Sequence, residues 1–388
     1  MRFSLPIPWM VTEAKAKTRF GQRNIPPAVD LIVEISLFIL IFIVSSILLE
    51  TIAFTILTVP LLLYNDSFLG EIQSSLQNGQ SVLDLDTATE ITAQVMATPE
   101  ATAIMLLATI GSIAGVLIYC RAIEGRKLAT LGFRRGHILR EYLIGWAIGA
   151  VMFSLVVMIA VLAGTITFEG LTGASAFMLL LFLIGYTVQG MSEEVLCRGY
   201  FLTSLARRQH LAVAIVVSSA FFGLLHLTNP NVSALAIINI TLFGAFEAIY
   251  LLKRGNIWGV AAIHTAWNFT QGSLYGTNVS GMGLHPSLLA FRPMAGSELI
   301  NGGSFGLEAG LAASLVIALA IVAALLLKCV EPTPDIQPTQ DLTSALIIVP
   351  GESPLPQRPI LWTPAPMSAL PPPSSTWSPP PPLWPPPS

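Results

Sequence analysis

Long apolar segments constrain the fold of this chain more than any other feature. The 388-residue sequence contains eight apolar runs, each of about 20 residues, which is the length that an α-helix needs to cross the hydrocarbon core of a bilayer. Only 11% of the residues are charged, against roughly 25% in an average soluble protein. The sequence therefore predicts an all-α fold, a polytopic transmembrane bundle of about eight spans. The expected spans are residues 30–52, 99–120, 142–165, 175–206, 211–228, 232–252, 256–272 and 309–327.

The first apolar run is longer than one span requires. It extends from Leu31 to Tyr64 and contains Glu50 and Pro60. Because proline interrupts the hydrogen bonding of a helix interior, and because an overlong apolar stretch must otherwise tilt or kink, we expect its last part to form a separate or interfacial segment.

The distribution of lysine and arginine predicts the orientation, because cytoplasmic loops retain positive charge during insertion. With the N-terminus inside, the basic residues fall on cytoplasmic segments, and only Arg292 falls on the opposite side. The acidic loop 65–98 contains no lysine or arginine, as an external segment would. Residues 1–29 contain five basic residues but no apolar core, so no cleavable signal peptide is expected. We expect a multi-pass plasma-membrane protein with both termini in the cytoplasm.

The C-terminal part is rich in proline. The last 58 residues, from Glu331, hold 19 of the 28 prolines, a composition typical of disordered or polyproline-II segments. A solvated tail is the favoured interpretation, and a cytoplasmic domain with an aromatic groove is the candidate partner. The net charge is only −3 and no basic domain stands apart, so nucleic acid is not an expected partner.

These features divide the chain into five expected regions. They are a cytoplasmic segment 1–29, N-terminal transmembrane helices with the acidic loop 30–170, a catalytic transmembrane core 171–275, an external loop and last helix 276–330, and the proline-rich tail 331–388. The small-residue pairs Gly111/Gly115 and Gly145/Gly149 predict close helix packing.

Ionisable side chains occur inside the predicted spans, where they are costly and therefore point to function. Glu193, Glu194 and Arg198 lie in the span 175–206, His226 in the span 211–228, and His264 with Asn268 in the span 256–272. At 1.5 Å of rise per residue, Glu193, His226, His264 and Asn268 reach depths of about 12–24 Å. The estimate requires the span 175–206 to be one helix.

Helical spacing suggests a role for each residue. Glu194 and Arg198 are four residues apart and are predicted to form a structural ion pair. Glu193 points about 100° away from Glu194 and is free to face a cavity. Glu247, in the span 232–252, either pairs with Arg198 or lines the cavity.

A carboxylate, two imidazoles and an amide around a hydrated cavity favour hydrolysis, by one of two mechanisms. In the favoured, metal-free mechanism, Glu193 with His226 removes a proton from water, and His264 with Asn268 stabilises the oxyanion. In the alternative, His226, His264 and Glu193 hold a zinc ion as cofactor.

The three polar segments resemble the signature of the CPBP family, which includes the type II CAAX prenyl endopeptidases and the bacteriocin-processing or self-immunity membrane proteins of bacteria. The family pattern is E-E-x-x-x-R, F-x-x-x-H and H-x-x-x-N. It matches Glu193-Glu194 with Arg198, Phe222 with His226, and His264 with Asn268, in order on separate predicted spans.

The resemblance implies an intramembrane endopeptidase that cleaves a membrane-associated peptide or protein. It marks as catalytic candidates Glu193, Glu194, His226, His264 and Asn268. Family members have been described both as metalloproteases and as glutamate-type proteases. Two other classes also bury ionisable groups: a proton-coupled transporter, for which inverted repeats are expected, and a non-catalytic membrane scaffold.

Overall fold

The computed structural model describes residues 8–18, 23–63, 98–283 and 286–330, together with five further positions: Leu69, Gly70, Gln73, Ser74 and Gln77. All of them belong to one compact unit, Met1–Gln337. The expected disorder and partner of the proline-rich tail, and nearly all of the acidic loop 65–98, lie outside the described residues.

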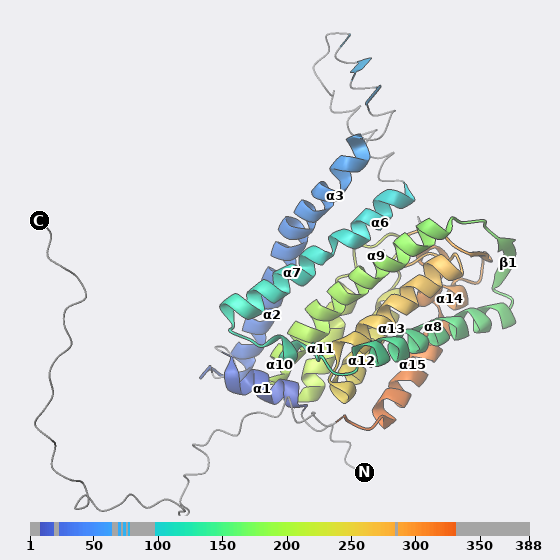
Figure 1. Ribbon diagram of the computed structural model, residues 1–388. Helices are drawn as coiled ribbons and strands as arrows, with labels where there is room; N and C mark the ends of the chain where they lie inside the picture. The colour runs from blue at the N-terminus through green and yellow to red at the C-terminus, as the bar shows by residue number, and fades with distance from the viewer. Residues whose placement is uncertain are drawn as a thin grey trace, which may run out of the picture. The chain divides into compact units, whose positions relative to one another are not determined.

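The described residues form a bundle of helices with one small sheet (Figure 1). Several helices continue into π-helical turns, which are numbered with the short 3₁₀ segments as η. The elements are α1 (Trp9–Lys17), α2 (Pro27–Ile43), η1 (Val44–Glu50), α3 (Thr51–Leu63), α6 (Pro99–Ala108), α7 (Ile110–Ile118), η2 (Tyr119–Ile123), η3 (Leu128–Leu131), α8 (Ile138–Leu162), β1 (Ile166–Leu171), α9 (Ala176–Glu194), η4 (Val195–Leu202), α10 (Thr203–Ala206), α11 (Leu211–Leu224), α12 (Ala234–Arg254), α13 (Ile257–Phe269), η5 (Thr270–Leu274), β2 (Leu289–Pro293), α14 (Glu298–Asn301), η6 (Gly303–Phe305), η7 (Leu307–Ala309) and α15 (Leu311–Leu326).

Each of the eight predicted spans coincides with a helix. Among the described residues, five helices are long and apolar enough to cross a membrane: Pro27–Val59, Pro99–Ile123, Ile138–Leu162, Ala176–Ala206 and Ala234–Arg254. The other three predicted spans correspond to α11, α13 and α15, which are shorter. The helical fold class is therefore confirmed, whereas the number of eight spans remains a prediction.

Of the two alternatives for the end of the first apolar run, the separate segment is wrong, and the interfacial segment stays a prediction. The helices α2, η1 and α3 follow one another without interruption from Pro27 to Leu63. Pro60 falls in the final turn of α3, where the missing backbone N–H interrupts only the end of the helix.

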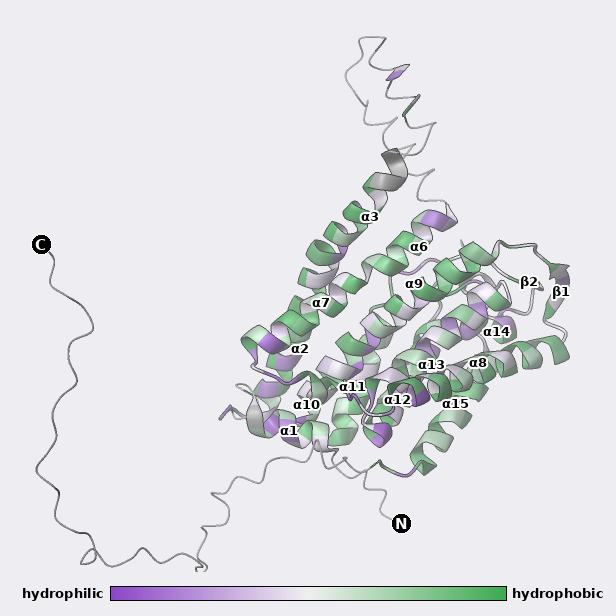
Figure 2. Cartoon of the chain, viewed as in Figure 1, coloured by the Kyte–Doolittle hydropathy of each residue, from purple (hydrophilic) through white to green (hydrophobic). Residues whose placement is uncertain are grey.

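The surface of the bundle is apolar along the helices. Hydrophobic residues cover most of their length, and hydrophilic residues gather near helix ends such as those of α6 and α12 (Figure 2). Large aliphatic side chains are exposed on several elements, for example Ile47, Leu139, Val216 and Leu319. Exposed apolar surface on this scale is unfavourable in water and is expected where lipid covers the protein.

The two small-residue pairs pack helices closely, as predicted. A Cβ atom at Gly145 would lie 2.1 Å from the carbonyl oxygen of Gly259, and one at Gly149 would lie 2.2 Å from that of Ile263. Helix α8 therefore contacts the backbone of α13, the helix that carries His264 and Asn268. Gly111 makes a similar approach to η1, since its Cβ would lie 2.6 Å from the backbone nitrogen of Glu50.

An ion-pair cluster joins the beginning of α2 to the end of α10. Arg207 contacts Glu34 at 3.0 Å and Glu124 at 3.1 Å, and Asp30 contacts Arg208 at 3.4 Å. All three carboxylates are fully buried or nearly so. Buried charges are tolerated when they are paired in this way, so the cluster fixes α2 against the segment after η4.

The small sheet was not predicted. Strands β1 and β2 pair antiparallel, with Phe168 opposite Phe291. The strands come from segments on either side of α9–α13, so their pairing is a non-local contact that local sequence patterns do not reveal. The sheet covers one end of the bundle next to α8 (Figure 1).

Candidate active site

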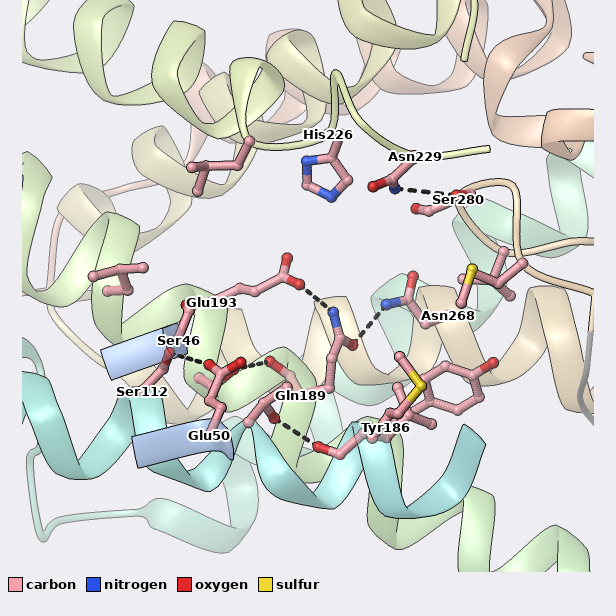
Figure 3. Close-up of a pocket in the computed structure, with 18 of the residues that line it drawn as sticks. Ser46, Glu50, Ser112, Tyr186, Gln189, Glu193, His226, Asn229, Asn268 and Ser280 are labelled. Carbon is pink, nitrogen blue, oxygen red and sulfur yellow. Dashed lines mark hydrogen bonds between the residues drawn. The ribbon is translucent and has the colours of Figure 1, made fainter. Parts of the chain in front are cut away.

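The site lies in a cavity of about 420 Å³ between the N-terminal helices and α9. Glu193, His226 and Asn268 line it, as the sequence predicted. Figure 3 shows Glu193 and Asn268 on either side of Gln189, with His226 across the cavity. The continuous helix from Ala176 to Ala206 that the depth estimate required is present.

Glu193 is the carboxylate that faces the cavity. Its side chain is 27% exposed, whereas that of the neighbouring Glu194 is fully buried, in agreement with the predicted rotation of about 100° between them. The Oε1 atom accepts a hydrogen bond of 2.5 Å from Gln189 Nε2. The Oε2 atom is buried, has no hydrogen-bond partner among the described residues and lies 3.6 Å from His264 Nε2.

His226 does not lie in a helix, contrary to the prediction. Helix α11 ends at Leu224, and His226 occupies the turn that follows. Its Nδ1 atom lies 2.9 Å from the carbonyl oxygen of Phe222. Because a carbonyl only accepts hydrogen bonds, Nδ1 must carry the proton, and in a neutral imidazole Nε2 is then left as an acceptor.

A buried charge cluster, made of Glu194, Arg198, Glu247 and His264, lies behind the cavity. Arg198 contacts Glu194 at 3.0 Å and Glu247 at 2.7 Å, and its guanidinium lies 3.9 Å from the centre of the Phe222 ring. The predicted Glu194–Arg198 pair is therefore present. Of the two alternatives for Glu247, the structure supports pairing with Arg198.

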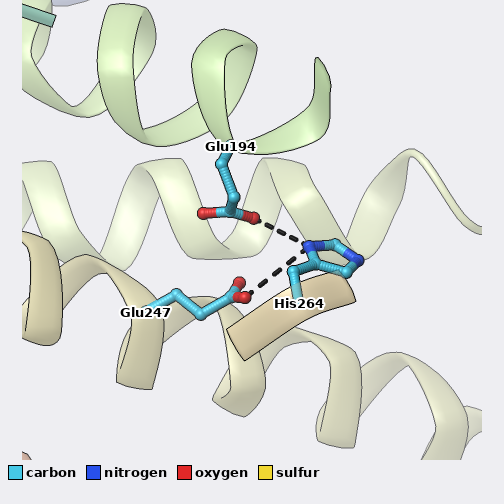
Figure 4. A group of neighbouring side chains, drawn as sticks. All are labelled: Glu194, Glu247 and His264. Carbon is cyan, nitrogen blue, oxygen red and sulfur yellow. Dashed lines mark hydrogen bonds and ion pairs between the residues drawn. The ribbon is translucent and has the colours of Figure 1, made fainter. Parts of the chain in front are cut away.

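His264 lies between Glu193 and the other members of the buried charge cluster, and Figure 4 shows it beside Glu194 and Glu247; it does not itself line the 420 Å³ cavity. Its Nδ1 atom lies 2.9 Å from Glu194 and 3.6 Å from Glu247. Its Nε2 atom lies 3.6 Å from Glu193 Oε2. The Nδ1 atom thus contacts two buried carboxylates, while the Nε2 atom is directed at Glu193.

Asn268 lies one helical turn after His264, and both residues line a smaller cavity with His226. The Asn268 side chain donates a hydrogen bond of 2.9 Å to Gln189 Oε1. Gln189 therefore bridges Asn268 and Glu193, a link that the sequence analysis missed. Its position four residues before Glu193, on the same helical face, was the available signal.

The structure does not gather the residues predicted for zinc. Among the described residues, one group of three carboxylate or imidazole ligands has its atoms within 4.8 Å of one another, and it consists of Glu194, Glu247 and His264. His226 is not part of it. Because Arg198 already contacts both of these glutamates, a zinc ion there would lie beside a guanidinium cation, and the group fits a metal poorly.

π-Helical turns accompany three of the site elements. Segment η4 begins directly after Glu194, η5 follows α13 two residues after Asn268, and η1 ends at Glu50, which also lines the cavity. Such wide turns are rare and occur frequently at functional sites. Of the three, η1 itself supplies polar side chains to the cavity, namely Ser46 and Glu50.

Comparison with known proteins identifies the region that carries these residues. Residues 174–270 match the family model "Type II CAAX prenyl endopeptidase Rce1-like". No curated protein and no solved structure matches the chain. The matched region includes Glu193, Glu194, Arg198, His226, His264 and Asn268 in the order of the family signature. The apolar helices and this match together identify an integral membrane protein whose segment 174–270 is similar to the Rce1-like type II CAAX prenyl endopeptidase family.

Proposed function

We propose that the chain is an intramembrane endopeptidase that hydrolyses a peptide bond in a membrane-associated protein or peptide. The observation that carries the proposal is the shared cavity of about 420 Å³, into which Glu193, His226 and Asn268 all project. The family match to prenyl endopeptidases supports the reaction class.

Glu193 and His226 are the proposed water activators. The Glu193 carboxylate and His226, whose Nε2 is an acceptor in the neutral imidazole, both line the cavity in which the water molecule would be bound. As the water oxygen bonds to the carbonyl carbon, its proton passes to Glu193, and the carbonyl π electrons move to oxygen. When the C–N bond breaks, that proton is delivered to the leaving nitrogen, and the carboxylate is restored.

His264 and Asn268 are the proposed oxyanion donors. The buried charge cluster contains two carboxylates, Glu194 and Glu247, but only one arginine, so a His264 imidazolium would bring its net charge to zero. Such an imidazolium donates through Nδ1 to Glu194 and keeps Nε2–H for the oxyanion. The Asn268 amide must exchange its contact with Gln189 for the oxyanion.

We propose that the reaction proceeds without a metal. The alternative is zinc held by His226, His264 and Glu193, and the poor fit of the gathered ligand group supports the metal-free mechanism. The experiment that tests the function compares cleavage of a library of membrane peptides by the purified protein in detergent with and without a metal chelator. Cleavage that persists after chelation is the expected result.

Replacing Asn268 with alanine should lower kcat by ~10²–10³-fold, the usual effect of losing one oxyanion donor, with no change in bound metal. Asn278→Ala is the matched control, because this amide contacts the carbonyl of Ser304 and does not line the 420 Å³ cavity. Steady-state kinetics and elemental analysis of the same preparations provide the two measurements. Zinc that is present at one ion per chain, leaves together with activity and restores it on return would contradict the metal-free mechanism.

A further inference from the structure

A second carboxylate projects into the cavity from the wall that lies outside the family-matched region. Glu50, at the end of η1, lines the cavity together with Ser46 from the same turn and Ser112 from α7. Figure 3 shows Glu193 between Glu50 and His226. The water-activating residues and Glu50 thus face the same space from different helices.

Glu50, like Glu193, has no lysine or arginine partner among the described residues, whereas four other carboxylates of the long helices do. Asp30, Glu34, Glu194 and Glu247 each lie within 3.0 Å of an arginine nitrogen. Among the described residues, the ion pairs do not include Glu50, and its hydrogen bonds come from the hydroxyls of Ser112 and Ser46. An ionisable group in a membrane helix is costly unless it is paired or hydrated. A cation that enters the cavity would therefore stabilise the Glu50 carboxylate.

The backbone around Glu50 is held firmly. A Cβ atom at Gly111 would lie 2.6 Å from the Glu50 nitrogen, and one at Gly115 would lie 2.7 Å from the Ser45 Cβ. The close packing of α7 against η1 therefore prevents this turn from rotating away. A fixed carboxylate loses little conformational freedom when it binds a ligand.

The cavity also has the composition that a basic side chain requires. The described residues that line it include two carboxylates, Glu50 and Glu193, but no lysine and no arginine. Apolar side chains stand beside them, among them Phe42, Met105 and Leu106. Lysine and arginine combine an apolar stem with a charged end, so both parts of such a side chain find a complementary surface.

We propose that Glu50 is a specificity-determining residue that binds the lysine or arginine side chain of a substrate segment during its cleavage at Glu193. The inference rests on the proposed endopeptidase function, since it assumes that a peptide occupies the cavity. The charged end of the side chain forms an ion pair with Glu50, and Ser46 and Ser112 hold the carboxylate in place. A substrate with an acidic residue at the same position is disfavoured.

The test uses matched membrane peptides that differ at one position, which carries lysine, norleucine or glutamate and is moved stepwise along both sides of the scissile bond. Wild type is expected to cleave the best lysine peptide about 10–100-fold faster, in kcat/KM, than its norleucine counterpart, the range that one charge-assisted hydrogen bond supplies. Glu50→Gln should reduce this preference to below about 3-fold while still cleaving the norleucine peptide normally. Glu50→Lys should shift the preference to the glutamate peptide.

Two further variants complete the design. Ser112→Ala, which removes a hydroxyl that holds the carboxylate, should weaken the lysine preference in part. Glu169→Gln is the control, since Glu169 pairs with Arg292 on β2 and does not line the 420 Å³ cavity, and it should keep the full preference. An unchanged preference in Glu50→Gln, or an equal loss of activity with all three peptides, would overturn the assignment, the second result indicating a general role in proton transfer or folding.

A binding measurement separates this inference from the proposed function. In the Glu193→Gln background, fluorescent lysine and norleucine peptides should differ about 10–100-fold in Kd, and adding Glu50→Gln should remove the difference. If wild type cleaves no peptide, the proposed function fails, and the binding measurement still decides whether Glu50 recognises a cation. Equal binding of the two peptides by the Glu193→Gln protein rejects the inference.

Discussion

Glu193→Ala and His226→Ala should each abolish measurable proteolysis while leaving the protein as stable as wild type. A positioned general base contributes about 10²–10⁴-fold to the rate, and no other carboxylate among the described residues lies as close to the His264 Nε2 atom. Stability should be preserved because Glu193 is 27% exposed to the cavity and forms no ion pair with lysine or arginine among the described residues. Single-turnover cleavage and thermal unfolding in detergent measure the two effects.

Glu193→Gln is the matched variant for this experiment. It keeps an oxygen that accepts the hydrogen bond from Gln189 but cannot remove a proton from water. We expect it to fold like wild type and to remain inactive. Turnover at the wild-type rate in either alanine variant would show that the general-base assignment is wrong.

Arg198→Ala should act mainly on folding. The change leaves both Glu194 and Glu247 buried without their arginine, and breaking a buried pair costs ~3–5 kcal/mol. The contact between the guanidinium and the Phe222 ring is lost as well. We expect a lower yield of folded protein and a lower Tm in detergent. Arg292→Ala provides a control, because its pair with Glu169 is exposed and such pairs contribute only about 0–1 kcal/mol.

Removing the whole set of charges distinguishes structural from catalytic effects. The triple variant Arg198→Met, Glu194→Gln and Glu247→Gln should recover part of the lost Tm, since buried ion pairs are often replaced by neutral residues at little cost. A single Arg198→Ala variant with the Tm of wild type but without activity would instead assign Arg198 to substrate binding.

Local sequence spacing predicted those parts of the site that depend on one helix. The Glu194–Arg198 pair follows from the 3.6-residue period of the helix, and so does the rotation of about 100° that turns Glu193 away from Glu194. Both features are present. The packing of Gly145 and Gly149 against α13 is equally a property of one helical face.

Contacts between distant segments could not be predicted in the same way. The pairing of β1 with β2 and the approach of Glu50 to the site depend on how separate elements are placed and rotated. The turn around His226 was missed because Leu225 and Leu227 continue the apolar run beyond the end of α11. Glu247 had two open alternatives for the same reason, since its partner Arg198 lies on another helix.

The ion-pair cluster at the start of α2 places a constraint on how the molecule is assembled during synthesis. Glu34 contacts Arg207, which is 173 residues later in the chain. At ~5–20 residues per second, the ribosome needs about 10–35 s to reach that arginine. During this interval Arg23 is the one arginine partner of Asp30 and Glu34 in the cluster that has already been synthesised. Helix α2 is therefore made early but completes its ion pairs only after the family-matched segment that contains Arg207 has been synthesised.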